Sequence, residues 1–180
     1  MSEKQIISIR NAPNAKKGLL DLIAYMDAKT PVKSLEIVEI GCYVGDATAI
    51  FAAHFKHIYA VDPWENGYDP TDAASYQHPM AIIEKQFDEM ARNYNNISKI
   101  KMPSVEAVKH FPYIDAIYID GVHTYDGCKN DLNLWRNLVK PGGFICGHDY
   151  QSRFPGVMKA VDEFGKPDKI FSDTSWAFQV

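Results

Sequence analysis

The segment SLEIVEIGCYVG, residues 34–45, decides the fold that this sequence predicts. Its first seven residues are largely apolar, which indicates a strand over 34–40 that ends at Gly41. A glycine directly after a strand allows a tight turn and lets a ligand lie against the backbone. Residues 46–56 are predicted to form the next helix, and Gly45 lets that helix pack closely.

Strand-like and helix-like segments alternate along the rest of the chain. Apolar runs predict further strands over 57–61, 97–102, 115–120, 144–147, 170–171 and 176–180. Apolar residues at helical spacing predict helices that begin near Asn14 and Pro79 and that cover 105–110, 128–138 and 156–164. The Pro141-Gly142-Gly143 turn is expected to stop the helix that precedes it.

Strands that alternate with helices imply parallel pairing, whereas two closing strands joined by a short turn should pair antiparallel. We therefore expect a fold of the α/β class: a Rossmann-like, doubly wound, mostly parallel seven-stranded sheet with an antiparallel last strand. A chain of 180 residues suits one domain of ordinary size, so residues 1–180 are expected to form a single domain.

Composition narrows the classes of function. The net charge of −4 and the absence of Lys or Arg runs argue against a nucleic-acid or anionic-membrane partner. No segment approaches the roughly 20 apolar residues of a membrane span, and the polar N-terminus lacks the apolar stretch of a signal peptide. Cys42, Cys128 and Cys146 show no C-x-x-C spacing, as expected for a reducing cytoplasm. A homo-oligomer remains open.

The first two strand ends predict a cofactor site, because ligands of doubly wound sheets bind beyond the carboxyl ends of the strands. Asp62 ends the second strand, where a carboxylate can accept hydrogen bonds from both ribose hydroxyls of a nucleoside. The loop after the first strand is G-x-x-x-G and lacks the third glycine typical of nicotinamide binders. Asp46 at the following helix start would repel a pyrophosphate, which favours S-adenosylmethionine.

The sequence resembles the class I S-adenosylmethionine-dependent methyltransferases. The similarity lies in residues 39–45, Asp62, Ser104 and the turn at 141–143, and it extends from about residue 15 to 180. It implies that the glycine-loop backbone faces the methionine part, that Glu39 holds the amino group, and that Ser104 lies near the adenine. The cofactor-binding residues so implied are Glu39, Gly41, Tyr43, Gly45, Asp62, Ser104 and Asp120. The alternative for Ser104 is a helix cap.

Two acidic strand ends predict a metal site. Asp120 ends the fourth strand and Asp149 follows the fifth, so adjacent parallel strands would bring both carboxylates to one edge of the sheet. Carboxylates held together repel each other unless a proton or a cation joins them. Oxygen ligands suit Mg²⁺, whereas an imidazole from His148 would favour manganese, iron or zinc. Asp120, His148 and Asp149 are therefore the candidate metal ligands.

The second half resembles a narrower group, the cephalosporin-hydroxylase-like and macrolide-sugar O-methyltransferases of methyltransferase family 24 type. The similarity lies in I-D-G-x-H-x-Y at 119–125, in Asp131, and in G-H-D-Y at 147–150. Catechol O-methyltransferase is also similar in its E-I-G-C-Y-V-G segment and in the strand ends that carry its metal ligands. The resemblance implies that Asp120 and Asp149 bind the metal and that His123 is the general base.

Each of these roles has an alternative. Asp120 and Asp149 can instead cap turns, and His123 can be a histidine that only completes a hydrogen-bond network. His148 departs from the pattern, because metal-dependent relatives commonly carry a carboxylate there. Asp131 lies within a predicted helix and is expected to be solvated or locally paired, not a ligand.

The predicted reaction is methyl transfer from S-adenosylmethionine to a small-molecule hydroxyl. A neutral alcohol is a poor nucleophile, so a metal that lowers its pKa and a histidine that takes its proton would both assist. Sugar, phenol and polyketide hydroxyls are all open as acceptors, and so is a nitrogen. Two other functions compete: a non-catalytic cofactor-binding module of the same fold, and a nicotinamide-dependent dehydrogenase.

The segment over 63–79 is longer than the usual 2–6 residues of such a connection, which indicates a functional loop. Trp64, Tyr68 and Tyr76 are expected to form a lid or an acceptor wall. The alternative is a loop that is disordered without ligand.

Overall fold

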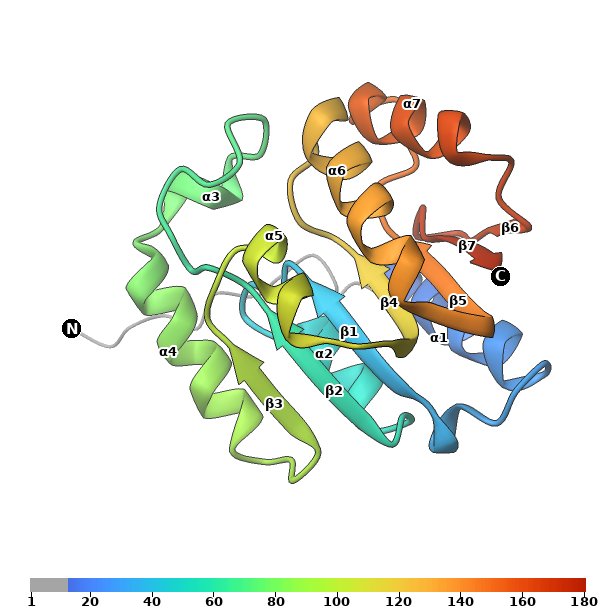
Figure 1. The fold of residues 1–180 in the computed structure, drawn as a ribbon. Coiled ribbons are helices and arrows are strands. Elements are labelled where there is room, and N and C mark those ends of the chain that lie inside the picture. Colours follow the sequence, from blue (N-terminus) through green and yellow to red (C-terminus); the bar gives the residue numbers. More distant parts are fainter. Residues whose placement is uncertain (1–12) are drawn as a thin grey trace.

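The computed structural model describes residues 13–180, with the side chain of Asn14 left out, so the predicted cap at Asn14 lies outside the described residues. Within this range seven strands form one sheet: β1 (Glu36–Ile40), β2 (His57–Val61), β3 (Ile97–Ile100), β4 (Ile114–Ile119), β5 (Val139–Gly147), β6 (Lys169–Ile170) and β7 (Trp176–Gln179). Their order is β3-β2-β1-β4-β5-β7-β6, as Figure 1 shows for the central strands. Among these strands β7 alone runs in the direction opposite to the other six, which confirms the predicted fold class.

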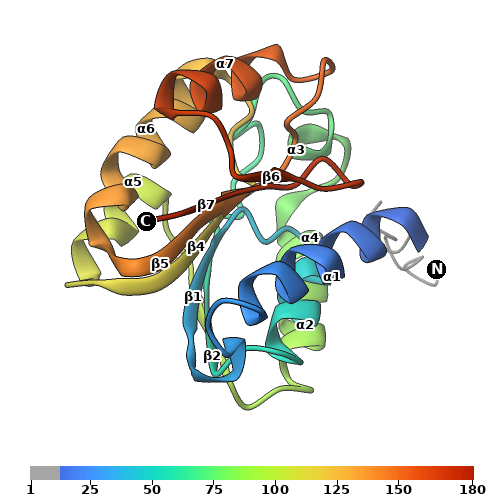
Figure 2. The same cartoon turned by 90° about the vertical axis from the view of Figure 1, so that its right-hand side faces the viewer.

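Helices cover both faces of the sheet (Figure 2). On one face lie α1 (Pro13–Asp27), α2 (Asp46–Ala52) and α4 (Met80–Ala91), and on the other lie α5 (Ser104–Ala107), α6 (Tyr125–Trp135) and α7 (Pro155–Phe164). The short helix α3 (Ala74–Gln77) belongs to the segment over 63–79, and single 3₁₀ turns occur at Val32–Ser34, Val108–His110 and Arg136–Leu138. None of the helices described over 13–180 combines the length and apolarity needed to cross a membrane.

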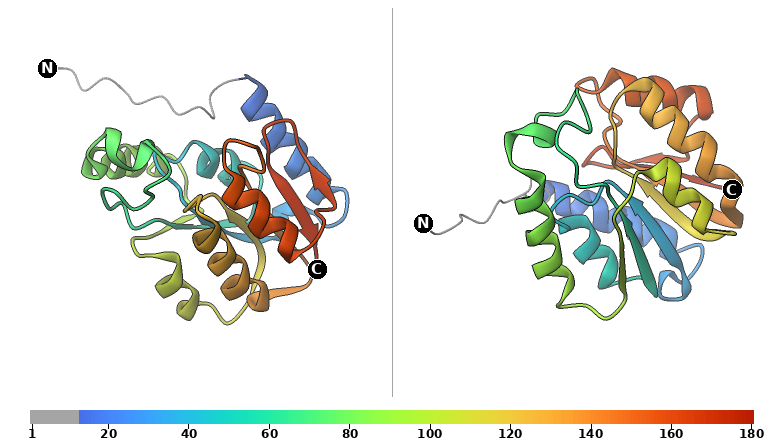
Figure 3. Two further views of the ribbon diagram at one scale, coloured as in Figure 1. Left: turned by 90° about the horizontal axis from the view of Figure 1, so that it is seen from above. Right: turned by 60° about the vertical axis from the view of Figure 1, so that its left-hand side comes forward.

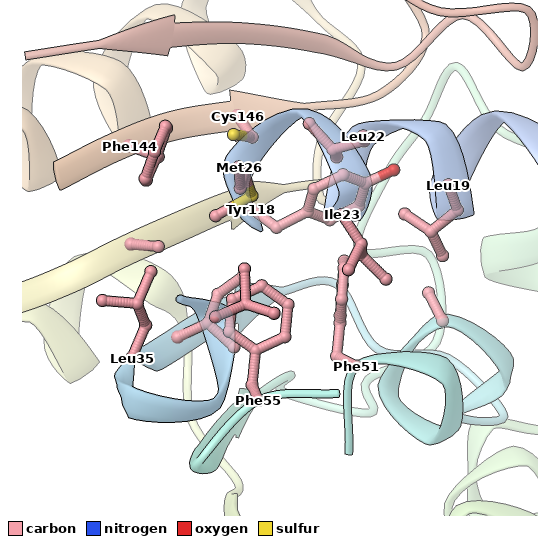
Figure 4. Close-up of a cluster of buried hydrophobic side chains, with 14 of the residues drawn as sticks. Leu19, Leu22, Ile23, Met26, Leu35, Phe51, Phe55, Tyr118, Phe144 and Cys146 are labelled. Atoms are coloured by element: carbon pink, nitrogen blue, oxygen red, sulfur yellow. The ribbon is translucent and has the colours of Figure 1, made fainter. Parts of the chain in front are cut away.

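Successive residues of each central strand point into opposite cores, which explains why these strands are apolar on both faces. Ile37 of β1 packs in the core under α1 and α2, whereas its neighbour Val38 packs under α6 and α7. Figure 4 shows the first core, where Phe51 of α2 and Tyr118 of β4 meet edge to face with ring centroids 5.0 Å apart.

The strand order fixes the position of a ligand site. The chain runs from β1 outward to β2 and β3 and then crosses to β4 on the other side of β1, so the order reverses between β1 and β4. In doubly wound sheets the crevice at the carboxyl ends of such a pair holds the ligand. The right-hand view of Figure 3 shows the segment that contains α3 and the last helix, α7, at the same end of the molecule.

The turn over 141–143 does not stop a helix, which corrects the sequence prediction. Helix α6 already ends at Trp135, and β5 begins at Val139, so the three residues lie inside β5. The pairing with β4 shifts between Ile114 and Ala116, where the four β5 residues 140–143 stand opposite the single β4 residue Asp115. Gly142 takes a φ of 82° there and donates its N–H to the carbonyl of Val180.

The other element boundaries differ from the predictions by a few residues. The helix predicted over 46–56 ends at Ala52, and the strand predicted over 97–102 ends at Ile100. Helix ends fray, and hydrophobic pattern alone does not fix them. Despite these differences, the predicted strand ends all stay at the carboxyl edge of the sheet.

Replacement of Phe51 by alanine tests the core under α1 and α2. Phe51 is fully buried, so Phe51→Ala is expected to lower the free energy of unfolding by about 3–5 kcal/mol. Tyr113 is 62% exposed, and Tyr113→Ala should change the same quantity by less than about 0.5 kcal/mol. Urea unfolding of both variants measures the difference, and equal losses would contradict the packing described here.

Candidate active site

A cavity of about 690 Å³ opens at the carboxyl ends of β1, β2, β4 and β5. Nine of the predicted site residues line it: Glu39, Gly41, Tyr43, Asp62, Ser104, Asp120, His123, His148 and Asp149. Residues from both halves of the sequence therefore share one cavity. Gly45 is the exception, because it precedes α2 and faces the side chains of Phe87 and Met90.

The glycine loop is shaped by a close approach of two chain segments. Gly41 has a φ of 84°, and any Cβ at this position would overlap the backbone carbonyl of Asp120. The Gly41 N–H donates to the Val61 carbonyl at 2.9 Å, and the Asp120 N–H donates to the Ile40 carbonyl at 2.8 Å. Only glycine satisfies both the backbone conformation and the space at position 41.

Asp62 holds this loop through its carboxylate. Its Oδ2 accepts the N–H groups of Cys42 at 2.9 Å and Tyr43 at 3.0 Å, and its Oδ1 accepts the N–H of Trp64 at 2.7 Å. Burial raises the pKa of Asp62, and these backbone donors oppose the rise. Asp62 therefore ties the end of β2 to the glycine loop, and it also lines the cavity where the ribose was predicted.

Ser104 and Asp131 form a buried pair at the same end of the cavity. The Ser104 hydroxyl donates to Asp131 Oδ1 and accepts the indole N–H of Trp135 at 2.9 Å. Ser104 does not cap α5, whose cap position is Pro103, so that alternative is wrong. Asp131 is only 5% exposed, so it is locally paired and not solvated. Burial raises its pKa to about 6, although the bond from Ser104 opposes this.

Four side chains converge at the other end of the cavity. Asp149 Oδ2 lies 2.8 Å from His123 Nε2 and 3.1 Å from His148 Nδ1, and the latter nitrogen lies 3.5 Å from Asp120 Oδ1. Asp120, His123 and Asp149 each place a ligand atom within 4.8 Å of the other two, and His148 Nδ1 faces the same two carboxylates, so either imidazole could complete a metal site. Asp149 has a φ of 62°, which directs its side chain from the end of β5 into this group.

His148 is held from outside by the turn before β7. Its Nε2 lies 2.6 Å from the backbone carbonyl of Asp173. A carbonyl oxygen can only accept, so Nε2 carries the proton of this hydrogen bond. The other nitrogen, Nδ1, therefore faces the two carboxylates as a potential ligand.

Asp69 is a site residue that sequence analysis missed. Its Oδ2 accepts the backbone N–H of His123 at 2.7 Å and lies 2.6 Å from His123 Nδ1. Its Oδ1 accepts the backbone N–H and the hydroxyl of Thr71 at 2.8 and 2.7 Å. The only signal in the sequence was the unusual length of the segment over 63–79, which does not select one residue.

The ring of His123 is enclosed on three sides. Two carboxylates contact its nitrogens, and the ring stacks on Phe154 with centroids 4.3 Å apart. Burial lowers the pKa of His123, but the hydrogen bonds to Asp149 and Asp69 and the nearby carboxylate charges outweigh burial and raise it to about 10. The same bonds hold the pKa values of Asp69 and Asp149 well below their usual range, despite burial.

The three aromatic residues of the segment over 63–79 do not act together, contrary to the predicted lid. Tyr68 lines the cavity, and burial together with several nearby carboxylates raises its pKa to about 12. Trp64 is buried against Phe87, with ring centroids 4.8 Å apart, and donates to the Tyr43 carbonyl at 3.0 Å. Tyr76 is 57% exposed and does not line the cavity.

A family model described as a methyltransferase domain matches residues 38–150, which contain every predicted site residue. The chain belongs to this methyltransferase family. The family is the type 24 methyltransferase family that the sequence resembles, so that resemblance is confirmed. The membership removes the nicotinamide-dependent dehydrogenase from the competing functions.

One curated protein is similar to this methyltransferase in sequence, and two solved structures are similar to it in fold. An uncharacterized protein of Acanthamoeba polyphaga mimivirus, R132, is 30% identical over 72% of this chain and 58% of its own length, so the chain spans less than two thirds of that relative. The O-methyltransferase NovP superposes with a TM-score of 0.64 at 19% identity, covering 92% of this chain and 79% of NovP. The calicheamicin methyltransferase CalS11 superposes with a TM-score of 0.64 at 15% identity, covering 93% of this chain and 80% of CalS11.

Asp131 should make the stability of this methyltransferase depend on pH. Its pKa rises from 3.8 to about 6 on folding, so the folded state binds the proton more tightly and Asp131 costs increasing stability as the pH rises through this window. Asp131→Asn removes this titration. Between pH 4 and pH 7, its free energy of unfolding should therefore rise relative to that of the wild type by about 2–3 kcal/mol. Urea unfolding at several pH values measures the gain.

The matched control is Asp126→Asn, an exposed position on the same helix. The difference in free energy of unfolding between Asp126→Asn and the wild type should not change over this pH range. A pH-independent difference for Asp131→Asn would show that Asp131 is not desolvated in the folded protein.

Proposed function

We propose that this methyltransferase uses S-adenosylmethionine to methylate a hydroxyl of a small molecule, with a divalent cation held at Asp120, His148 and Asp149. The observation that carries the proposal is the shared cavity, in which the glycine loop with Asp62 and the cluster around His123 face one space. A methyl donor at one end and an acceptor at the other would then lie next to each other.

The charge of the cavity favours a cationic cofactor. Its described lining carries ten carboxylates: Glu39, Asp46, Asp62, Glu65, Asp69, Asp72, Asp120, Asp131, Asp149 and Asp173. Arg153 is the one Lys or Arg among the described lining residues. Such a surface attracts a sulfonium and an ammonium group and repels a pyrophosphate. Glu39, fully buried at the end of β1, lies where the amino group was predicted.

The predicted ligand residues fit a divalent cation. Ligands bonded to one ion at about 2.1 Å and at right angles lie about 3 Å apart. His148 Nδ1 lies 3.1 Å from Asp149 Oδ2 and 3.5 Å from Asp120 Oδ1, which is close to that spacing. The Asp173 carbonyl keeps Nδ1 turned toward the carboxylates, as a second shell does in metal sites.

In this proposal, each part of the site has a defined task. Bound S-adenosylmethionine would supply the methyl group and leave as S-adenosylhomocysteine, and a divalent cation held by Asp120, His148 and Asp149 would lower the pKa of the acceptor hydroxyl. Asp62 keeps the glycine loop in the shape that receives the methionine part. A cation bound at Asp149 would withdraw the carboxylate that keeps Nε2 protonated, and His123 would then accept the proton of the acceptor hydroxyl at Nε2, a step worth roughly 10²–10⁴-fold in rate.

The carboxylates of the cavity also limit which acceptor molecules can bind there. CalS11 is described as a TDP-rhamnose 3′-O-methyltransferase, so its acceptor carries a diphosphate. In this cavity a diphosphate would meet carboxylates and a single guanidinium among the described lining residues. We therefore favour an acceptor without phosphate next to the reacting hydroxyl, such as a free sugar or a phenol.

Binding and turnover together test the function. Isothermal titration with S-adenosylhomocysteine should show saturable binding, and mass spectrometry should detect methyl transfer to members of a sugar and phenol panel. Transfer should require added Mg²⁺ or Mn²⁺ and stop with a chelator. Binding without transfer to any acceptor, with both metals present, would favour the non-catalytic cofactor-binding module.

Two variants should separate the halves of the site. Asp62→Ala removes three backbone hydrogen bonds of the loop and should weaken S-adenosylhomocysteine binding by about 10–100-fold. His123→Ala should keep that affinity within about threefold while turnover falls by about 10²–10⁴-fold. Full turnover of His123→Ala would remove His123 as the base.

A further inference from the structure

We propose that Asp69 is the positioning residue of His123: it fixes the imidazole with Nδ1 protonated and Nε2 toward the acceptor, and it does so from the segment over 63–79. The inference rests on the proposed role of His123 as a base. It adds a residue that neither the sequence motifs nor the metal cluster contains.

The first argument is the double contact between the two residues. Asp69 Oδ2 lies 2.6 Å from His123 Nδ1 and accepts the His123 backbone N–H at 2.7 Å. One oxygen therefore fixes both the ring and the backbone of the same residue. Because a carboxylate only accepts, the hydrogen bond places a proton on Nδ1, and it turns Nε2 toward Asp149 and the cavity.

The second argument is that Asp69 cannot easily turn away. Its other oxygen accepts two hydrogen bonds from Thr71, and its backbone carbonyl accepts the Ser75 hydroxyl at 2.5 Å. The Ser75 carbonyl in turn accepts the Gly67 N–H at 2.7 Å. Asp69 is 4% exposed, and these hydrogen bonds keep one of its carboxylate oxygens directed at His123.

The third argument is the surroundings of the ring. Phe154 stacks on one face of His123, and Asp149 contacts Nε2, so the ring lies between a carboxylate outside and the cation site inside. An orienting carboxylate, an imidazole and a reacting group in this order form the arrangement by which general bases are positioned in unrelated enzymes. In such arrangements, exchanging the carboxylate for an amide lowers turnover by about 10⁴-fold because the tautomer is wrong.

The arrangement also connects the segment over 63–79 with the chemistry. Trp64 anchors the start of the segment to the glycine loop, and Asp69 anchors its middle to His123. The segment therefore spans from the cofactor half to the acceptor half of the cavity. A shift of this segment would displace Asp69 and the base together.

Imidazole NMR of the protein without cofactor or metal tests the inference directly. In a ¹⁵N-labelled sample, His123 should show a protonated Nδ1 with a downfield, slowly exchanging proton. Asp69→Asn should lose this signal, because Thr71 donates two hydrogen bonds that retain the single amide oxygen and so turn the amide nitrogen, which cannot accept, toward His123. An unprotonated His123 Nδ1 in the wild type overturns the inference, whatever the outcome of any assay.

Kinetics supply the second readout. Asp69→Asn should lower kcat by about 10²–10⁴-fold, with KM and S-adenosylhomocysteine affinity changed by less than about threefold. Tyr76→Phe, at an exposed position of the same segment that does not line the cavity, should retain the wild-type kcat. Thr71→Val loosens the loop at Asp69 without touching His123, and it should retain the Nδ1 signal.

The outcomes separate the two proposals. A wild type that transfers no methyl group but shows the Asp69-dependent Nδ1 signal would refute the proposed function and leave the positioning intact. An active wild type whose kcat survives Asp69→Asn would refute the positioning and leave the function intact. A kcat loss shared equally by Thr71→Val, with the Nδ1 signal unchanged, would mean that Asp69 only stabilises the loop.

Discussion

The site depends on how closely the ends of β1 and β4 approach each other. Gly41 lies against the backbone of Asp120, and the Asp120 N–H is bonded to the Ile40 carbonyl at 2.8 Å. This contact joins the loop that receives the cofactor to the residue that begins the acidic cluster. A side chain at position 41 would separate the two strand ends, and the cavity would no longer combine both sets of residues.

The cluster around His123 contains several charged groups that are buried away from water. Carboxylates that leave water are costly unless donors or cations compensate them. Asp69 receives four hydrogen-bond contacts, and Asp149 lies between two imidazoles. The compensation comes from groups that also orient the reacting atoms. The two apolar cores on either side of the sheet carry the stability that such a site does not supply.

Much of the fold was predictable because strands buried on both faces and helices with one apolar face leave distinct patterns. The strand ends at Ile40, Val61, Ile119 and Gly147 followed from these patterns, and with them the sheet edge that gathers Asp62, Asp120 and Asp149. The turn at 141–143 was misjudged because Pro and Gly also occur in a strand irregularity, where pairing with the next strand decides the outcome.

Residues whose role depends on contacts far apart in sequence were harder to predict. Asp69 reaches His123 across 54 positions, and no periodicity marks a side chain in an irregular segment. Trp64 was expected at the acceptor, but the packing of α4 buries it against Phe87. Ser104 was assigned to either adenine or a cap, while its hydroxyl is bonded to Asp131 and Trp135 of α6. Tertiary packing, and not local pattern, determined each of these positions.

The hairpin of β6 and β7 reaches the centre of the site from the far edge of the sheet. Its turn holds His148 through the Asp173 carbonyl, bonds the Tyr150 N–H through Thr174, and brings the Trp176 indole to the His148 carbonyl. Shortening the chain before Asp173 would therefore leave the parallel strands paired but release the imidazole. Anyone who trims this protein for crystallisation or fuses it to a partner should keep that hairpin intact.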